Sequence, residues 1–392
     1  MRVLVVGAGI TGLAAARGLL RAGHEVTVLE RAGALRTGGG AISLLGGGTR
    51  VLAALGADVR GDGMRLGSLE AVSAAGRRAV RIDAHRLERV LGGPALMILR
   101  RAILERLAAT LPPGTVRYGA EFHVLRSGHL DGDEQVEIGT RDGERHTADL
   151  LIGSDGAHSR VRAALFGPVR QPRAAAASYL GTARLPVDLG DRSLMYLGRR
   201  GIVGLAPLGG GLTQWFLDVP WRPGPRPADP VAVLRERYGR WAAPVPDVLD
   251  AAAELHAAGT GELRAYPHYR LPTLRRWTRG RCVLMGDAAH AMSPVLGFGA
   301  NQGLEDVAEL LRDLDAAAPG VEGLPEALDR YGRRRRWRAA TAAAVGGSAI
   351  ALTGPRSLAQ TEPGLRLASL VPDGVATGAF GLITTVISAG RG

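Results

Sequence analysis

The sequence predicts an α/β fold with two lobes. One lobe contains a mainly parallel sheet, the other a mainly antiparallel β-sheet, and helices follow at the C-terminal end. The chain has 392 residues, more than one hydrophobic core normally organises. Glycine-rich signatures of a kind that binds nucleotides lie far apart, at residues 7–12, 153–156 and 286–290. Alternating polar and apolar segments with glycine turns lie between them, so the parallel lobe must be discontinuous.

A strand, a tight turn and a helix open the chain. Residues 2–6 are predicted to form a short buried strand, and residues 13–22 a helix that follows the last glycine of the turn. Gly7 permits the turn, Gly9 lets backbone N–H groups approach a pyrophosphate, and Gly12 lets the helix pack close to the strand. The helix N-terminus then presents the positive end of its dipole to the phosphates.

A second strand, residues 25–29, ends in Glu30. This acid lies about twenty residues after the turn, where its carboxylate can accept hydrogen bonds from ribose hydroxyls. Strand, turn, helix, strand and acid in register make up a complete dinucleotide fingerprint and predict a Rossmann-like lobe. An ordinary glycine turn in an α/β core is the alternative, and it does not account for the acid.

The third signature carries a resemblance. The segment from Arg281 to Asp306 contains Gly286-Asp287 followed by Pro294 and several glycines, and it resembles class A flavoprotein monooxygenases of the para-hydroxybenzoate hydroxylase type. In that family the Gly-Asp pair accepts the ribityl hydroxyls of FAD, and the proline and glycine loop runs beneath the isoalloxazine ring. An apolar strand delivers Asp287 to a turn here, and the helix starting at residues 299–303 can direct free N–H groups toward a flavin edge.

The middle signature, Asp155-Gly156 after an apolar strand, resembles the Asp-Gly motif of the same family. In relatives this motif helps to hold FAD and is implicated in nicotinamide cofactor binding. By itself it also fits a buried strand that ends in an Asx-type turn and caps a helix. Its position between the two other signatures, in the order of the family, favours the flavin interpretation.

The resemblance therefore implies FAD as the cofactor, with NADPH or NADH as a transient co-substrate. Two arginines fall where flavin contacts are expected, Arg36 before a glycine-rich stretch and Arg101 at the start of a helix over residues 101–111. The predicted FAD contacts are Gly7, Gly9, Ile10, Thr11, Gly12, Glu30, Arg31, Arg36, Ser43, Arg101, Asp155, Gly156, Gly286, Asp287, Pro294, Gly297, Gly299, Ala300 and Asn301.

The formal net charge is +12, which would ordinarily suggest nucleic acid as a partner. All the basic residues are arginine, however, which is typical of a GC-rich genome, so we expect no nucleic-acid partner. The cluster at Arg333–Arg336 and Arg338 is predicted to be a solvated helix face. The absence of lysine also excludes a Schiff base, a pyridoxal phosphate anchor and a Walker-type phosphate site.

The single cysteine, Cys282, excludes an intrachain disulfide and a cysteine metal cluster and is predicted to be a small core residue. The nine histidines show no metal-binding pair at helical spacing, so we expect no metal. Met1 leads directly into the first strand, which leaves no room for a signal peptide and favours a cytoplasmic enzyme. Residues 374–390 lack charge but are short for a membrane span, and a packed terminal helix is favoured over peripheral contact with a membrane.

These anchors divide the chain. The FAD lobe is expected to comprise residues 1–67, 95–170 and 270–345, the second lobe residues 68–94 and 171–269, and a C-terminal helical segment residues 346–392. The predicted antiparallel strands are residues 69–73, 80–83, 193–197, 202–205 and 212–219. The resemblance implies that this sheet covers the flavin.

The substrate is expected between that sheet and the flavin, because pockets form preferentially at domain junctions. The predicted lining residues are Tyr196, Gln214, Phe216, Pro294 and Phe298, each of a type that is also common in cores. Tyr196 or His268 is a candidate general base on residue type alone, and the sequence assigns no catalytic residue.

The resemblance implies a monooxygenase that uses NAD(P)H and O2 to hydroxylate or epoxidise a small organic substrate through a flavin C4a-hydroperoxide. GC-rich composition suggests an aromatic or polyene secondary metabolite. Two alternatives stay open: the same scaffold as a reductase or cyclase, and a binding module in which FAD is structural or a redox sensor. Substrate-stimulated consumption of NAD(P)H distinguishes the monooxygenase from the others, and both a monomer and a homodimer fit the sequence.

Overall fold

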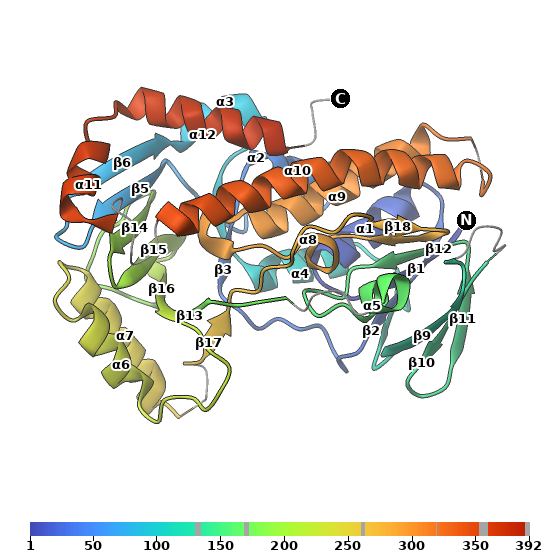
Figure 1. Ribbon diagram of the computed structural model, residues 1–392, viewed down its shortest axis with the longest axis horizontal. Coiled ribbons are helices and arrows are strands. Elements are labelled where there is room, and N and C mark those ends of the chain that lie inside the picture. The colour runs from blue at the N-terminus through green and yellow to red at the C-terminus, as the bar shows by residue number, and fades with distance from the viewer. Residues whose placement is uncertain (130–134, 168–171, 260–262, 319, 353–359, 389–392) are drawn as a thin grey trace.

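The computed structural model describes residues 1–129, 135–167, 172–259, 263–318, 320–352 and 360–388. Its first lobe is built on a six-stranded sheet in the order β18-β19-β12-β1-β2-β8 (Figure 1). Every neighbouring pair in this sheet is parallel except β18 and β19. The strands are β1 (Arg2–Val6), β2 (Glu25–Glu30), β8 (Val116–Tyr118), β12 (Leu150–Gly153), β18 (Thr278–Arg279) and β19 (Cys282–Leu284). Strands from three distant stretches therefore form one sheet, as a discontinuous lobe requires.

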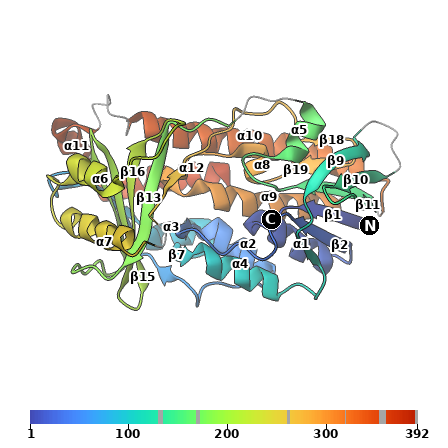
Figure 2. The same ribbon diagram turned by 90° about the horizontal axis from the view of Figure 1, so that it is seen from below.

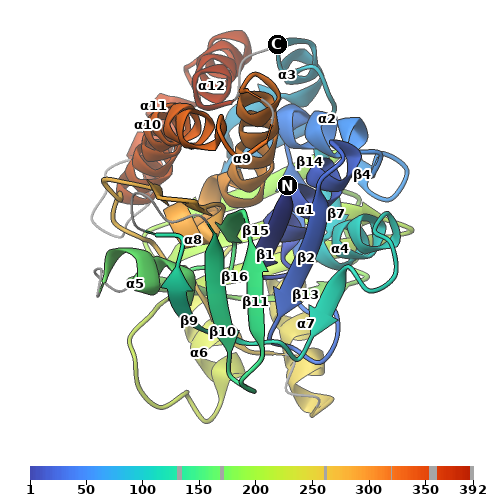
Figure 3. The same cartoon turned by 90° about the vertical axis from the view of Figure 1, so that its right-hand side faces the viewer.

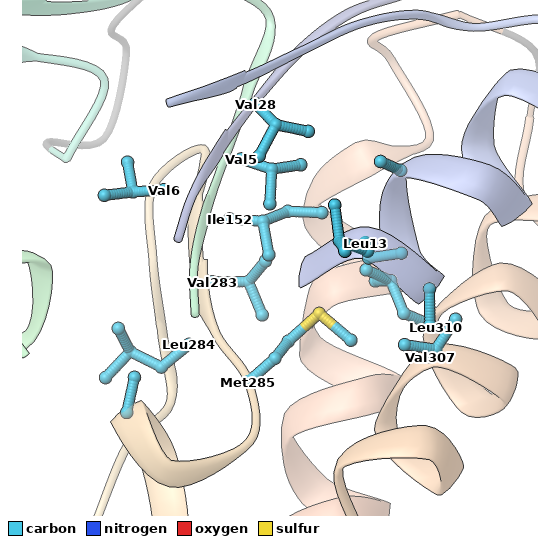
Figure 4. Packing of buried hydrophobic residues seen from close by; sticks show 14 of the residues in the cluster. Val5, Val6, Leu13, Val28, Ile152, Val283, Leu284, Met285, Val307 and Leu310 are labelled. Atoms are coloured by element: carbon cyan, nitrogen blue, oxygen red, sulfur yellow. The ribbon is translucent and has the colours of Figure 1, made fainter. Parts of the chain in front are cut away.

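Helices cover one face of this sheet because alternate side chains of its apolar strands point toward them. Figure 4 shows Val5, Val28 and Ile152 on the side of the sheet that faces Leu13 of α1 (Ile10–Arg21). Val307 and Leu310 of α9 (Phe298–Asp315) lie beyond them. All these side chains belong to one buried cluster, whose removal from water is the main stabilising term of the lobe. The predicted strand–turn–helix is confirmed, with the helix beginning three residues earlier than expected.

A small antiparallel sheet, β11-β10-β9, lies against the same lobe. Its strands are β9 (Phe122–Ser127), β10 (Val136–Thr140) and β11 (Arg145–Ala148), and Figure 3 looks onto the end of the molecule that carries them. Phe122, Val136 and Ile138 contribute to the buried cluster of the parallel sheet. Helices α4 (Arg100–Ala109) and α5 (Arg160–Phe166) complete this end, with α4 against α1 and α5 against β9.

The second lobe is a seven-stranded sheet in the order β17-β13-β16-β15-β14-β5-β6. The strands are β5 (Ser68–Ser73), β6 (Arg78–Asp83), β13 (Ala176–Ala183), β14 (Arg192–Gly198), β15 (Gly201–Gly209), β16 (Leu212–Pro220) and β17 (Ala265–Pro267). All pairs are antiparallel except β14 and β5, which are parallel. Helices α6 (Pro230–Tyr238) and α7 (Val245–Ala257) cover its outer face, as Figure 2 shows. The five predicted strands are present, whereas β13 and β17 were not predicted.

A third sheet, β3-β7-β4, lies at the junction of the lobes, where β7 and β4 contact β15. Its strands are β3 (Ala41–Leu44), β4 (Met64–Arg65) and β7 (Leu96–Leu99), and helices α2 (Gly46–Ala54) and α3 (Ala84–Leu91) are close to it in sequence. Because β3 pairs with β7 and the backbone at the start of β3 bonds to a side chain of β16, this sheet fixes the position of one lobe against the other.

The remaining segments after β19 are α8 (Asp287–His290), the 3-10 turn Pro294–Leu296, α10 (Leu324–Leu352), α11 (Glu362–Ala368) and α12 (Asp373–Ile387). Helix α10 is continuous through residue 345, so the boundary that the sequence suggested there falls inside a helix. In the described part of the chain no single helix is both long and apolar enough to cross a membrane. Among the described residues one pair, α11 and α12, passes that test together, and the two helices are bent by 90°.

The arginine cluster of α10 is not simply a solvated face, which corrects the expectation from sequence. Arg335 has no exposed surface, and its Nε donates to Asp306 Oδ1 on α9 at 2.7 Å. Arg334 and Arg338 each lie 3.1 Å from the buried carboxylate of Glu309. The arginines therefore neutralise a row of acids on α9, because charges buried between two helices must be paired.

Candidate FAD site

The turn between β1 and α1 is held so tightly that only glycine fits at two positions. Gly7 has φ +104°, and a Cβ there would lie 2.6 Å from the Ser154 carbonyl oxygen. A Cβ on Gly12 would lie 2.0 Å from the Gly7 carbonyl oxygen. The turn, the start of α1 and the end of β12 are therefore in van der Waals contact through their backbones.

Gly9 differs from these two glycines because no atom lies within 4 Å of the Cβ position. Gly9 is the N-cap residue of α1, and no side chain caps the helix there. The first N–H groups of α1 are consequently free to bind an anion, with the helix dipole favouring negative charge. The space in front of Gly9 is the space that a pyrophosphate needs.

Glu30 lies beside this turn at the end of β2, almost fully buried. Its Oε2 accepts a hydrogen bond from the Ala8 N–H and its Oε1 one from the Ala32 N–H, both at 2.9 Å. Each carboxylate oxygen keeps a further lone pair, so the side chain is fixed in place and can still accept from a ribose hydroxyl.

A cleft opens in front of these groups. Seven of the predicted FAD contacts line it, namely Gly7, Gly9, Glu30, Arg31, Arg36, Asp155 and Gly156. The sequence reasoning missed its other lining residues, which are Val6, Ala8, Arg100, Ala120, Glu121, Phe122, Ser154, His158 and Arg160. Of these, Ala8 and Ser154 lie inside the first two glycine-rich signatures, His158 and Arg160 follow the Asp-Gly motif, and Arg100 directly precedes the predicted contact Arg101.

The first of the two adjacent arginines of α4 lines the cleft, and the second points elsewhere. Arg100 Nη1 donates to the carbonyls of Arg36 and Gly38 at 3.0 and 3.1 Å. Arg101 is 58% exposed and lies 3.8 Å from Glu105 on the next turn of α4. A helix turns about 100° per residue, so neighbouring side chains cannot both face the cleft. Arg100 therefore lines the cleft in this geometry, whereas Arg101 is directed to solvent.

The Asp155 carboxylate is held at the start of α5. Its Oδ2 accepts from the N–H groups of Arg160 and Val161 at 2.7 and 3.2 Å. Its Oδ1 is buried, and no hydrogen bond from the described residues reaches it. Burial raises the pKa of Asp155, against the opposing effect of the nearby Ser159 hydroxyl and the two N–H groups. A buried acceptor without a donor in a cleft is what a site for a hydroxyl- or amide-bearing ligand leaves open.

The Gly286-Asp287 turn is anchored from below by a buried polar network. Gly286 N–H donates to Asp306 Oδ2 at 2.7 Å, and His290 Nε2 lies 2.7 Å from the same oxygen. Burial alone would raise the pKa of Asp306, but the charges of His290 and Arg335 lower it, so the acid stays ionised. Asp306 thus holds the turn in place through a charge-assisted hydrogen bond.

Asp287 itself is exposed, yet the protein packed around it raises the pKa of its carboxyl by desolvation, with His290 and Arg100 opposing the rise. The carboxylate is therefore open to solvent on one side and enclosed by protein on its other sides. Thr11 of α1 joins this turn to the first one, because Cβ atoms on Gly286 and Gly303 would lie 2.7 and 2.2 Å from its hydroxyl. The predicted contact Ile10 is buried in the core beneath.

Asn301 acts as a clamp between α9 and β3. Its Nδ2 donates to the carbonyls of Ser43 and Gly297 at 3.0 and 2.8 Å, and its Oδ1 accepts from Leu45 N–H at 2.9 Å. Gly297 is left-handed with φ +66° and forms the N-cap of α9 without a side-chain cap. Gly299 and Ala300 in the first turn therefore present free N–H groups, and Pro294 just before them is exposed.

The predicted substrate residues separate onto two faces. Gln214 and Phe216 lie on the face of the seven-stranded sheet opposite α6 and α7; Gln214 Oε1 accepts from Ala41 N–H at 2.9 Å, and Phe216 remains partly exposed. Tyr196 lies on the other face, packed in the cluster with α6 and α7, and its hydroxyl donates to the Ala243 carbonyl at 3.3 Å. Tyr196 is therefore not brought to the junction of the lobes.

The Phe298 side chain is also inaccessible to a substrate at this junction. It is 1% exposed and packs against Phe380 of α12 with ring centroids 6.3 Å apart. A side chain that fills the core between α9 and the C-terminal helix cannot contact a substrate without leaving that core. The expectation that Phe298 lines the substrate pocket is corrected on this geometry.

His268 belongs to a buried polar cluster with Ser178 and Asp218. Ser178 Oγ lies 2.6 Å from His268 Nε2 and donates to Asp218 Oδ1 at 2.6 Å. Burial lowers the pKa of His268 to about 4 and raises the pKa of Asp218 to about 7, although the Ser178 hydroxyl opposes the latter. His268 is consequently neutral near pH 7 and a weak base, so residue type alone misjudged it.

The residues present fit FAD. The open space at Gly9, the two uncapped helix N-termini, the fixed acceptors Glu30 and Asp287, and the donorless Asp155 Oδ1 meet a pyrophosphate, hydroxyl groups and a flavin edge. Within the described residues no group of three or more His, Cys, Asp or Glu side chains is arranged to hold a metal ion.

Comparison with known proteins identifies the family. Residues 1–345 match the family model described as FAD binding domain. The chain is an FAD-dependent monooxygenase of this family. The enzyme is 30% identical over 335 residues to aurachin C monooxygenase/isomerase of Stigmatella aurantiaca, covering 84% of each chain. It is 33% identical over 338 residues to 3-amino-4-hydroxybenzoate 2-monooxygenase of Streptomyces cremeus, covering 84% of the enzyme and 82% of that relative.

Solved structures share the fold. Klebsiella pneumoniae HpxO complexed with FAD and uric acid superposes with a TM-score of 0.85 over 98% of the enzyme and 97% of that chain, at 23% identity. A salicylate hydroxylase substrate complex gives a TM-score of 0.77 over 98% and 97%, at 22% identity. These structures share the class A fold with the enzyme. The family match assigns FAD as its cofactor, and NAD(P)H is the usual co-substrate of the family.

Proposed function

We propose that FAD lies along the cleft with its pyrophosphate at the β1–α1 turn and its flavin ring near the start of α9. The convergence of free N–H groups, Glu30 and the unpaired Asp155 Oδ1 on one cleft is the observation that carries this placement. Glu30 would accept from the adenosine ribose, and Asp287 from the ribityl chain. Arg100 and Arg36 would bring positive charge to the phosphates.

The substrate is a small aromatic or polyene molecule that binds between the seven-stranded sheet and the flavin. The inner face of that sheet supports an apolar ligand, because Phe216 pairs in register with Leu180 and both are partly exposed. Gln214 adds a fixed amide at the same face, where a Cβ on Gly40 would lie 2.9 Å from its Nε2. The names of the relatives, which act on aurachin C and 3-amino-4-hydroxybenzoate, support the same class.

FAD, when bound, accepts electrons from NAD(P)H and activates O2. The protein therefore has to bind the substrate, orient it against the flavin and keep the site free of water. The uncapped N-terminus of α9 places N–H groups where a reduced flavin accumulates negative charge. The seven-stranded sheet and the β3 junction exclude water from the substrate side, held together by Gln214 and Asn301. NAD(P)H is a cytoplasmic reductant, which supports a cytoplasmic enzyme.

The function is tested by the visible absorption spectrum of the purified enzyme under anaerobic NADPH and then NADH. We expect flavin bands that bleach with NAD(P)H and return with air. We also expect an aromatic or polyene substrate to accelerate NAD(P)H oxidation and to yield a product with one added oxygen atom. Oxidation of NAD(P)H without oxygen insertion would favour the reductase. Bands unaffected by NAD(P)H with every substrate class tried would instead favour a cyclase or a structural role for FAD and overturn the proposal.

A further inference from the structure

The segment from α11 to α12 holds more than half of the large hydrophobic side chains that are exposed in the described part of the chain. Eleven large hydrophobic side chains are exposed among the described residues, and six of them lie between residues 367 and 386. These six are Leu367, Leu370, Val371, Val375, Leu382 and Val386. Leu370 and Leu382 are 74% and 67% exposed, so most of each side chain is in contact with water. Exposed apolar side chains gathered in one segment are typical of an interaction surface.

The inward face of α12 is mixed. Thr377 and Thr384 are 2% and 1% exposed, a Cβ on Gly381 would lie 3.4 Å from Leu87 of α3, and Phe380 and Ile387 pack into the apolar cluster beside them. Thr377 Oγ1 accepts from Asp83 N–H of β6 at 3.0 Å, which fixes the helix against the second lobe. Val375, Leu382 and Val386 point outward at helical spacing. The segment is thus packed as a terminal helix, and its apolar face is still free.

The two helices form a surface feature and not a span. They are bent by 90° relative to each other, and Leu370 and Val371 lie at the bend. Figure 1 shows both helices along one outer edge of the molecule, beside β6 and α3. Apolar side chains presented from two non-collinear helices on one edge suit shallow insertion into an interface, which requires an apolar face but no membrane-spanning length.

The charges around this face are positive. Arg86 of α3 and Arg366 of α11 are exposed beside it, and Arg86 reaches α12, since a Cβ on Gly374 would lie 3.5 Å from its Nη1. The nearby acids are already engaged, Glu362 by Arg77 at 2.5 Å and Asp373 by Arg78 at 3.8 Å. The outward residues of α12 from Val375 to Val386 include no charge.

The positive rim distinguishes two kinds of occupant. In a two-fold contact between copies of this chain each patch would meet itself, so arginines would face arginines on two molecules of net charge +12. An anionic lipid surface attracts the same arginines. We propose that α11 and α12 form a docking surface for an anionic phospholipid bilayer, with their outward apolar side chains inserted at the headgroup boundary.

The proposal is tested by flotation of the FAD-loaded enzyme with vesicles of phosphatidylcholine alone or mixed with phosphatidylglycerol. Binding to the mixed vesicles is expected at about 0.1 M salt and should fall severalfold near 1 M, where the Debye length shrinks from about 10 to about 3 Å. Leu370→Ser and Leu382→Ser should each reduce the partition coefficient about tenfold, because each loses the burial of one leucine. The matched control is Val233→Ser, a substitution of a 39% exposed residue on α6, in the other lobe; it should bind as the wild type does.

The double variant Arg86→Gln and Arg366→Gln should lose the preference for phosphatidylglycerol and keep its FAD content. Failure of the wild type to float with either vesicle would overturn the proposal. A dimer by light scattering that Leu370→Ser or Leu382→Ser converts to a monomer would also overturn it, because the face would then hold a second copy. Since lipid binding is measured without turnover, its failure leaves the proposed reaction untouched.

Discussion

The buried cluster of Ser178, Asp218 and His268 makes a sharp prediction for Asp218→Asn. Burial raises the pKa of Asp218 from 3.8 to about 7 and lowers that of His268 from 6.5 to about 4. Around pH 5.5 both groups are therefore neutral in the folded protein, whereas both are charged in the unfolded chain. Folding thus transfers one proton from the histidine to the acid, 3.8 Å away.

The two groups contribute to stability with opposite signs. For Asp218, whose pKa is raised by folding, the stabilising contribution is complete below its unfolded pKa of 3.8 and is lost as the pH rises through about 7. For His268, whose pKa is depressed, the contribution is complete above 6.5 and is lost as the pH falls through about 4. Each slope is about 1.4 kcal/mol per pH unit, so the two cancel over the window that they share.

Asp218→Asn removes one slope and exposes the other. The asparagine mimics the neutral acid and keeps an acceptor for Ser178 Oγ–H. Relative to the wild type, the free energy of unfolding of the variant should rise by about 2 kcal/mol between about pH 4.5 and 6.0. His268→Asn should show the mirror image, a relative loss of about 2 kcal/mol over the same interval.

The assay is urea unfolding at several pH values, followed by tryptophan fluorescence. Three of the five tryptophans, Trp215, Trp221 and Trp241, lie in the lobe that contains the cluster, so the signal reports on it. A relative stability of Asp218→Asn that is constant or falls with rising pH would refute the reasoning. That result would mean that Asp218 and His268 form a buried ion pair, whose disruption should destabilise the fold by about 3–5 kcal/mol.

Three further substitutions test the site. Gly9→Ala should leave the stability of the FAD-free protein unchanged, because no atom outside the neighbouring residues lies within 4 Å of the new Cβ. It should raise the Kd for FAD about tenfold or more, because the Cβ occupies the pyrophosphate space. Gly33→Ala, equally unhindered, is the control in flavin-fluorescence titrations, and equal FAD affinity of the two variants would contradict the placement. Arg100→Gln should weaken FAD binding about 10- to 100-fold through the loss of a charged donor, whereas Arg101→Gln should change it less than about twofold; a larger effect at Arg101 would reverse the assignment of the two arginines. Asp306→Asn should lower the free energy of unfolding by about 3–5 kcal/mol in thermal melts, since it leaves buried Arg335 without its counter-charge. Asp329→Asn, which breaks the exposed pair with Arg333, is the control and should cost less than about 0.5 kcal/mol.

The dinucleotide turn could be predicted in detail because its geometry is set by neighbours in sequence. Gly7 adopts φ +104°, and Gly12 touches the Gly7 carbonyl oxygen, as the spacing required. Glu30 ends β2 beside the turn. A turn of about six residues leaves few backbone paths, so the glycines specify the local structure almost alone. The Asp-Gly and Gly-Asp turns were found from sequence for the same reason.

The faces of strands and helices could not be predicted, because they depend on what packs against them. A change of one residue in strand phase moves a side chain to the opposite face, which separates Gln214 and Phe216 on the inner face of the sheet from Tyr196 beneath α6 and α7. A shift of one residue on α4 separates Arg100 from Arg101.

Long-range partners were equally invisible in the sequence. Phe298 meets Phe380, and Arg335 meets Asp306, only because α9, α10 and α12 pack together. The sequence by itself therefore determined the turns and many of the elements, which follow from local backbone preferences, and the family resemblance of its motifs implied the cofactor. The tertiary structure alone decided which side chains face the cleft, the core or the solvent, because that choice is made by contacts between segments far apart in the chain.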